Sequence, residues 1–105
     1  MSAQKENIVS KQIYKILADL TGEMRFDMAV HLATKDLLRL KLQEVERETR
    51  ALEKRYKMNF DDFKRAWDKG GIADRNSYEV ERDYWDWEAL VTNRGHLEEM
   101  LGFLT

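Results

Sequence analysis

The stretch of sequence over residues 23–57 contains no Gly and no Pro and reads EMRFDMAVHLATKDLLRLKLQEVERETRALEKRYK. Its apolar residues fall into two stripes with the alternating four and three spacing of an α-helix. The first stripe consists of Phe26, Val30, Ala33, Leu37 and Leu40. The second has the spacing of a coiled-coil seam and consists of Leu38, Leu42, Val45, Thr49, Leu52 and Tyr56. The segment therefore predicts one long helix.

The length of this helix bears on the quaternary structure. A helix over residues 23–57 would be about 52 Å long. A compact chain of 105 residues has a radius of gyration near 13 Å and thus a diameter of roughly 33 Å. The helix must project, bend or pack against another chain. We predict a homo-oligomer whose seam consists of Leu38, Leu42, Val45, Leu52 and Tyr56. The alternative is that the long helix packs against the first and last helices of its own chain.

Two shorter helices are predicted beside the long one. An N-terminal helix is expected over residues 7–20, where apolar residues recur at helical spacing, and Gly22 can adopt the left-handed conformation that ends it. A short third helix is expected over residues 60–69. Asn59 is a suitable N-cap for that helix, and Met58 and Phe63 have the spacing of a hydrophobic staple.

The last helix is predicted over residues 77–104. Asn76 and Glu79 have the spacing of a capping box at its start, and Gly95 introduces a point where it can kink. Residues 1–105 thus form a single all-α domain with a long central helix, an N-terminal helix, a short third helix and a C-terminal helix. The expected architecture is a helical bundle or a coiled-coil-like oligomer.

Composition excludes several classes of protein. The chain has no Cys and no Pro, so it has neither disulfides nor Cys-ligated zinc. It shows no signal peptide and no apolar run of about 18 residues, which predicts a cytoplasmic protein without membrane contact.

Residues 1–58 carry a net charge of +3 and residues 59–105 a net charge of −5. Either the two halves neutralise each other or the acidic half faces a basic partner.

Neither catalysis nor metal binding is favoured by the motifs. Asp27 and His31 could supply two metal ligands from one helix, but a structural site needs more, and neither His31 nor His96 follows a Glu at the spacing of a di-iron bundle. The sequence has no nucleophile elbow and no phosphate-binding glycine motif. We expect no enzyme, no cofactor and no metal. Nucleic acid is not an expected partner, because Glu residues interrupt the basic cluster of residues 47–57.

An acidic aromatic segment, residues 78–88, is the most distinctive part of the sequence and reads YEVERDYWDWE. Tyr84 and Trp87 share the apolar stripe of the last helix, which leaves Trp85 on another face. An aromatic ring between acidic residues suits a basic protein partner. The predicted partner-binding residues are Glu81, Trp85 and Glu88, extended to Asp61 and Asp62 if the short helix packs beside them. The alternative is that Trp85 packs on the long helix of its own chain.

Two further motifs resemble a known group of proteins. The runs Tyr56-x-Met58-Asn59-Phe60-Asp61-Asp62-Phe63 and Tyr84-Trp85-x-Trp87-Glu88-x-Leu90 look like those of small prokaryotic α-helical antitoxins. The resemblance covers roughly residues 38–104. It implies a non-enzymatic protein that neutralises or masks a partner, such as a co-encoded toxin, through its acidic aromatic half. A helical oligomerisation or scaffold subunit of a larger assembly is the alternative function.

Overall fold

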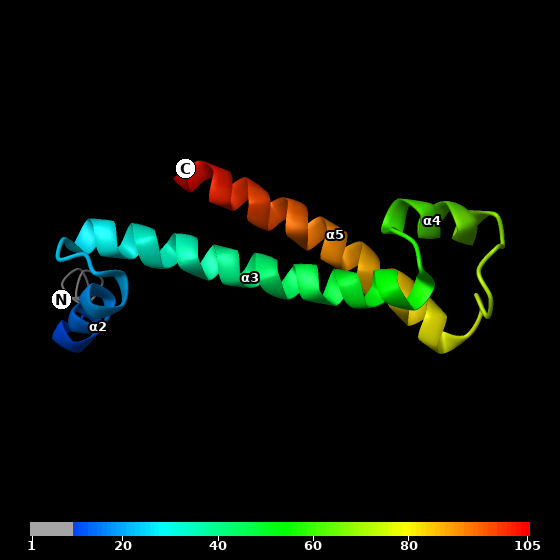
Figure 1. The fold of residues 1–105 in the computed structure, drawn as a ribbon, viewed down its shortest axis with the longest axis horizontal. Helices are drawn as coiled ribbons and strands as arrows, with labels where there is room; N and C mark the ends of the chain where they lie inside the picture. Colours follow the sequence, from blue (N-terminus) through cyan, green and yellow to red (C-terminus); the bar gives the residue numbers. More distant parts are fainter. Residues whose placement is uncertain (1–9) are drawn as a thin grey trace, which may run out of the picture.

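The computed structural model describes residues 10–105 and contains four helices and no strand in that range. They are α2 (Lys11–Thr21), α3 (Phe26–Tyr56), α4 (Phe60–Asp68) and α5 (Tyr78–Leu104), shown in Figure 1. The all-α prediction is therefore confirmed for the described part of the chain. The expected first turn of the N-terminal helix, residues 7–9, lies outside the described residues.

Local side-chain contacts set the ends of α2 and α3. The Ser10 hydroxyl accepts a hydrogen bond from the Ile13 amide at 3.1 Å and caps α2. Gly22, with φ of 72°, ends α2 in the left-handed conformation, as predicted. α3 begins at Phe26 rather than Glu23, because the Glu23 carboxylate accepts a hydrogen bond from the Arg25 amide and holds a non-helical link. α3 ends where Lys57 adopts a positive φ of 58°.

The junctions around α4 follow from their capping residues. The Asn59 side chain accepts a hydrogen bond from the Asp62 amide at 2.9 Å, so Asn59 is the predicted N-cap of α4. α5 is capped by Ser77, whose hydroxyl accepts from the Val80 amide at 3.3 Å. The N-cap is therefore one residue later than the predicted Asn76, and the predicted capping box is not formed, because the residue three positions after Ser77 is Val80, whose side chain has no acceptor. α5 continues through Gly95 as one helix.

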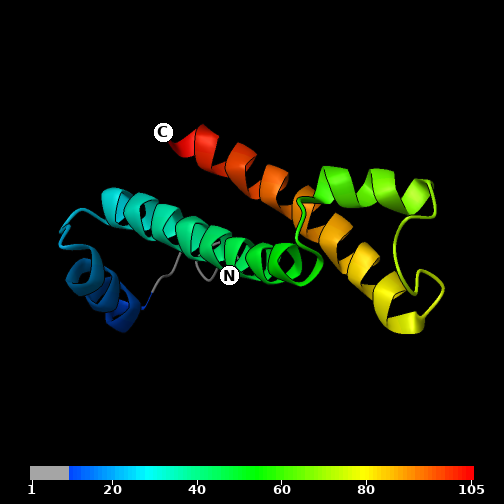
Figure 2. The ribbon, with the colours of Figure 1, turned by 45° about the vertical axis from the view of Figure 1, so that its right-hand side comes forward.

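The molecule is elongated. Its radius of gyration is 20.2 Å and its principal extents are 59, 31 and 22 Å, whereas a compact chain of this length has a radius of gyration near 13 Å. α3 and α5 pack against each other near α4, and their other ends diverge in both views (Figures 1 and 2). α2 packs on α3 at the end of the molecule distant from α4.

An aromatic core joins α3, α4 and α5 at one end of the molecule. Trp87 and Phe63 are fully buried, with ring centroids 5.0 Å apart. Leu52 of α3 and Ile72 of the α4–α5 loop are also buried in this cluster. Residues packed around it are Tyr56, Met58, Phe60, Ala66, Trp67, Val80, Tyr84 and Leu90. Both residues of the predicted staple, Met58 and Phe63, belong to this cluster.

Candidate protein-binding site

Trp85 lies on the outer face of α5, where 65% of its surface is exposed. Its neighbours Tyr84 and Trp87 face inward and contact Phe63 of α4, with ring centroids 5.9 and 5.0 Å apart. Successive residues of a helix are about 100° apart, so Trp85 points about 200° away from Trp87. The packing of its neighbours therefore holds Trp85 at the surface.

Two acidic residues flank this ring on the same helix. Glu81 is half-buried and Glu88 is exposed, four residues before and three residues after Trp85. At these spacings all three side chains share one face of α5. A surface depression beside them is lined by Trp85, Glu88, Ala89, Thr92, Asn93 and His96. The face thus combines a large, solvated aromatic ring with two carboxylates, and we call residues Glu81, Trp85 and Glu88 the Trp85 face.

Asp61 and Asp62 lie in the first turn of α4 and are exposed. The Asp62 carboxylate accepts a hydrogen bond from the Arg65 guanidinium at 2.6 Å on the same helix. Asp61 is two residues from the buried Phe63, so its side chain points about 200° away from the core that joins α4 to α5. No hydrogen bond or ion pair in residues 10–105 links Asp61 or Asp62 to the Trp85 face. Their participation in binding stays a prediction.

Part of the predicted oligomer seam packs against other helices of the same chain. Val45 and Leu52 are buried, and Leu52 belongs to the aromatic core. Leu38, Leu42 and Tyr56 are half-buried. The ring of Tyr56 stacks on Trp87 of α5, with centroids 6.0 Å apart. The C-terminal part of the seam therefore contacts α5 of the same chain, and self-association through the seam stays a prediction.

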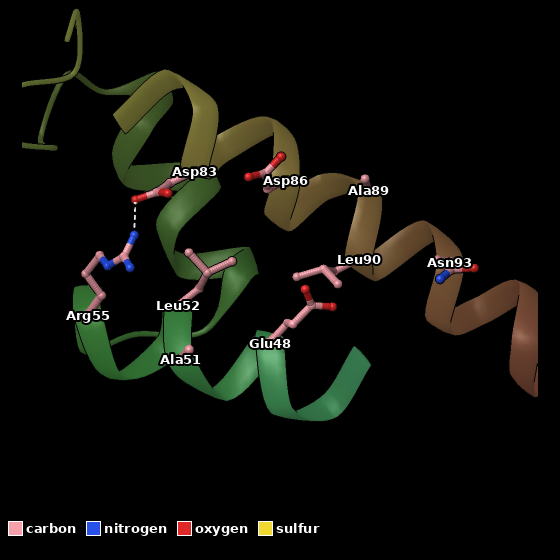
Figure 3. Close-up of a pocket in the computed structure, with 9 residues that line it drawn as sticks. All are labelled: Glu48, Ala51, Leu52, Arg55, Asp83, Asp86, Ala89, Leu90 and Asn93. Atoms are coloured by element: carbon pink, nitrogen blue, oxygen red, sulfur yellow. Dashed lines mark hydrogen bonds and ion pairs between the residues drawn. The ribbon is translucent and has the colours of Figure 1, made fainter. Parts of the chain in front are cut away.

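A polar contact that the sequence did not reveal joins α3 to α5. The Asp83 carboxylate accepts hydrogen bonds from the Tyr56 hydroxyl at 2.6 Å and from the Arg55 guanidinium at 2.7 Å. Figure 3 shows Arg55 reaching across to Asp83 at one end of an open pocket. The residues that line this pocket are Glu48, Ala51, Leu52, Arg55, Asp83, Asp86, Ala89, Leu90 and Asn93. Tyr56 and Asp83 are 27 residues apart, and no motif in one sequence pairs them.

The contact of Tyr56 and Arg55 with Asp83 holds α3 against α5. Burial, together with the hydrogen bond to Asp83 and its negative charge, raises the pKa of Tyr56 to about 12, so its phenol is neutral near pH 7. Asp83 raises the pKa of Arg55 as well, which keeps the guanidinium charged. Tyr56 is thus a poor base or nucleophile at neutral pH. Within residues 10–105, no group of three or more His, Asp or Glu side chains is close enough together to hold a metal ion.

Comparison with known proteins identifies a family. The model of the Uncharacterized protein MJ0235 family matches residues 2–104, nearly the whole chain. No curated protein and no solved structure matches the chain. Among the described residues, no helix has both the length and the apolar character needed to cross a bilayer.

Proposed function

We propose that this chain, which belongs to the MJ0235 family of uncharacterized proteins, is a non-enzymatic protein-binding module that holds a partner protein with the Trp85 face. The observation that carries this proposal is the 65% exposure of Trp85 between Tyr84 and Trp87, which both pack inward against Phe63. Trp is the residue type most enriched among binding hot spots. A solvated tryptophan contributes little to the folding of its own chain, so burial by a partner accounts for its presence.

The charges around Trp85 indicate the chemistry of the partner. Glu81 and Glu88 lie on either side of the ring, and residues 59–105 carry a net charge of −5. A basic partner would be steered toward this half of the chain by long-range attraction. The ring would then supply the buried apolar area that slows dissociation. The partner is therefore a protein with a basic groove wide enough to admit an indole ring.

An antitoxin function is the narrower form of this proposal. In that form the partner is a co-encoded toxin, whose active surface the acidic aromatic half of the chain masks. This form rests on the sequence resemblance of residues 38–104. A gene for a small basic protein adjacent to the gene for this chain would favour it.

A second candidate function is a scaffold or oligomerisation subunit. The observation that favours it is the elongated shape, with a radius of gyration of 20.2 Å against about 13 Å for a compact chain. A scaffold subunit would use its length and its exposed apolar stripes to contact other subunits, and it would not depend on one hot-spot residue. The two functions differ in the effect of Trp85, because a scaffold built through α2 and α3 would assemble equally well without that ring.

Co-purification from the native host tests the proposed function. The wild-type chain, Trp85→Ala and the matched control Phe103→Ala would be compared for the proteins that they retain. Phe103 is also exposed on α5 and lies 18 residues, or about 27 Å, from Trp85. We expect one basic protein to be retained by the wild type and the control and lost with Trp85→Ala. Equal retention by all three chains would contradict a binding site at Trp85.

A further inference from the structure

The end of the molecule formed by α2 and the first half of α3 has almost no core. Within residues 10–44 the only buried side chain is that of Ala29, and α2 buries none of its residues. In the same region, nine of the thirteen exposed large apolar residues of the described chain lie between residues 13 and 40. An isolated 11-residue helix is only marginally stable in water. Packing of α2 on α3 therefore needs further burial beyond what residues 10–105 supply.

The first stripe of α3 runs along this end of the molecule. Leu37 and Leu40 are 57% and 56% exposed, and Phe26 and Val30 are each 38% exposed. Ala33 lies at the centre of the stripe and is half-buried. The stripe is thus a row of partly exposed apolar side chains over about four turns of helix. Its first residue, Phe26, also stacks on Tyr14 of α2, with ring centroids 6.0 Å apart.

The stripe is complementary to itself when two copies of α3 run antiparallel. With Ala33 at the two-fold axis, Phe26 of one copy lies opposite Leu40 of the other, and Val30 lies within one residue of the level of Leu37. The small Ala33 side chain allows the two helices to approach closely at the axis. We infer that this chain forms a two-fold symmetric dimer in which the Phe26, Val30, Ala33, Leu37 and Leu40 stripes of two α3 helices pack antiparallel. Two-fold dimers with self-complementary surfaces are the commonest protein oligomers.

The molecule exposes more surface than a compact monomer. The chain exposes 8349 Å², whereas a compact monomer of 12.5 kDa exposes about 6,200 Å². The difference, about 2,100 Å², is spread over the whole elongated molecule, and a standard interface takes roughly 800 Å² from each partner. The apolar part of the excess is concentrated at the end formed by α2 and the first half of α3, where nine large apolar residues are exposed.

The charges of this region fit a second copy better than a highly charged partner. Residues 10–40 contain five Lys or Arg residues and four Asp or Glu residues, which leaves a net charge of +1. Two copies of this surface would repel each other only weakly. A nucleic acid or an anionic membrane would require a surplus of positive charge that is absent here. This dimer uses the first stripe of α3 and is distinct from self-association through the predicted seam, whose C-terminal residues Leu52 and Tyr56 contact α4 and α5 of the same chain.

Sedimentation equilibrium of the full chain tests the dimer. We expect wild type to be dimeric at about 50 μM, and Leu37→Glu/Leu40→Glu to raise the dissociation constant at least about 100-fold, because it would bury four charges in the interface. The control Val91→Glu/Phe103→Glu places two charges at exposed positions of α5 and should stay dimeric. A monomeric wild type, an unchanged dissociation constant in the first variant, or equal effects of both variants would overturn the proposal.

Disulfide trapping provides a readout that does not depend on stability. The natural sequence has no Cys, so Ala33→Cys should form an intermolecular disulfide on mild oxidation. Phe26→Cys alone should not, because the two copies of residue 26 would be about 20 Å apart along an antiparallel pair. A mixture of Phe26→Cys and Leu40→Cys chains should form the heterodimer disulfide. Cross-linking of Phe26→Cys with itself, or none at Ala33→Cys, would overturn the antiparallel arrangement.

Discussion

Trp85 and Trp87 are two residues apart on α5 and have opposite environments. Trp87 is fully buried, and its ring contacts Tyr56, Phe60 and Phe63 from two other helices. Trp85 is 65% exposed. Trp87 is therefore part of the core, whereas Trp85 contacts solvent. Substitution of Trp87 should change mainly stability, and substitution of Trp85 should change mainly binding of a partner.

Truncation of these two tryptophans should affect stability very differently. Trp87→Ala removes a fully buried ring and should lower the free energy of unfolding by about 3–5 kcal/mol. Trp85→Ala removes an exposed ring and should change it by less than about 0.5 kcal/mol. Urea denaturation followed by circular dichroism measures both. A large loss of stability for Trp85→Ala would mean that Trp85 is part of the core.

Burial of Tyr56, together with its hydrogen bond to Asp83, should make the free energy of unfolding depend on pH in the alkaline range. Folding raises the pKa of Tyr56 from 10.0 to about 12. The stabilising contribution is therefore complete below pH 10 and is lost as the pH rises toward 12, because the unfolded chain loses its phenol proton first. Tyr56→Phe should unfold with a weaker pH dependence than wild type between pH 10 and 12. Identical slopes would show that folding does not raise the pKa of Tyr56.

Glycine in place of Lys57, at the C-terminal end of α3, should stabilise the protein. Lys57 has φ of 58°, a conformation that costs an L-residue roughly 1 kcal/mol and costs glycine nothing. Lys57→Gly should raise the free energy of unfolding by about 0.5–1 kcal/mol. Lys57→Ala is the control, because it removes the same charge and keeps the backbone strain. If alanine stabilises as much as glycine, charge rather than backbone conformation is responsible.

The start of α5 provides a direct test of which residue caps it. The Ser77 hydroxyl accepts a hydrogen bond from the Val80 amide, and Asn76 is exposed and precedes the cap. Ser77→Ala should lower the free energy of unfolding by about 1 kcal/mol, and Asn76→Ala should leave it nearly unchanged. Thermal unfolding of both variants distinguishes the two assignments. A larger loss of stability for Asn76→Ala than for Ser77→Ala would mean that Asn76 is the N-cap.

Local signals account for the part of the fold that was predictable from the sequence. The Asn59 cap, the Gly22 end of α2 and the helical periodicity of residues 26–56 depend on neighbouring residues, and the structure contains all three. The outward position of Trp85 follows from the same periodicity once Trp87 is assigned to the core. Angular position on a helix is fixed by sequence spacing, so it can be derived without tertiary information.

Contacts between helices were not predictable from the sequence in the same way. Val45 and Leu52 could pack on α5 of their own chain or on another copy, and both arrangements require the same apolar spacing. The pairing of Tyr56 with Asp83 depends on how α3 crosses α5, which the spacing within either helix does not determine. The one-residue displacement of the α5 cap arises because Asn76 and Ser77 are both good N-cap residues.

The central claim is that Trp85 is the binding anchor of this chain, and calorimetric titration of the co-purified partner tests it most directly. The dissociation constant would be measured for wild type and for Trp85→Ala, with Phe103→Ala as control. The account predicts that Trp85→Ala raises the dissociation constant at least about 30-fold, equivalent to 2 kcal/mol, while its thermal unfolding stays close to that of wild type. Equal dissociation constants for wild type and Trp85→Ala would contradict it.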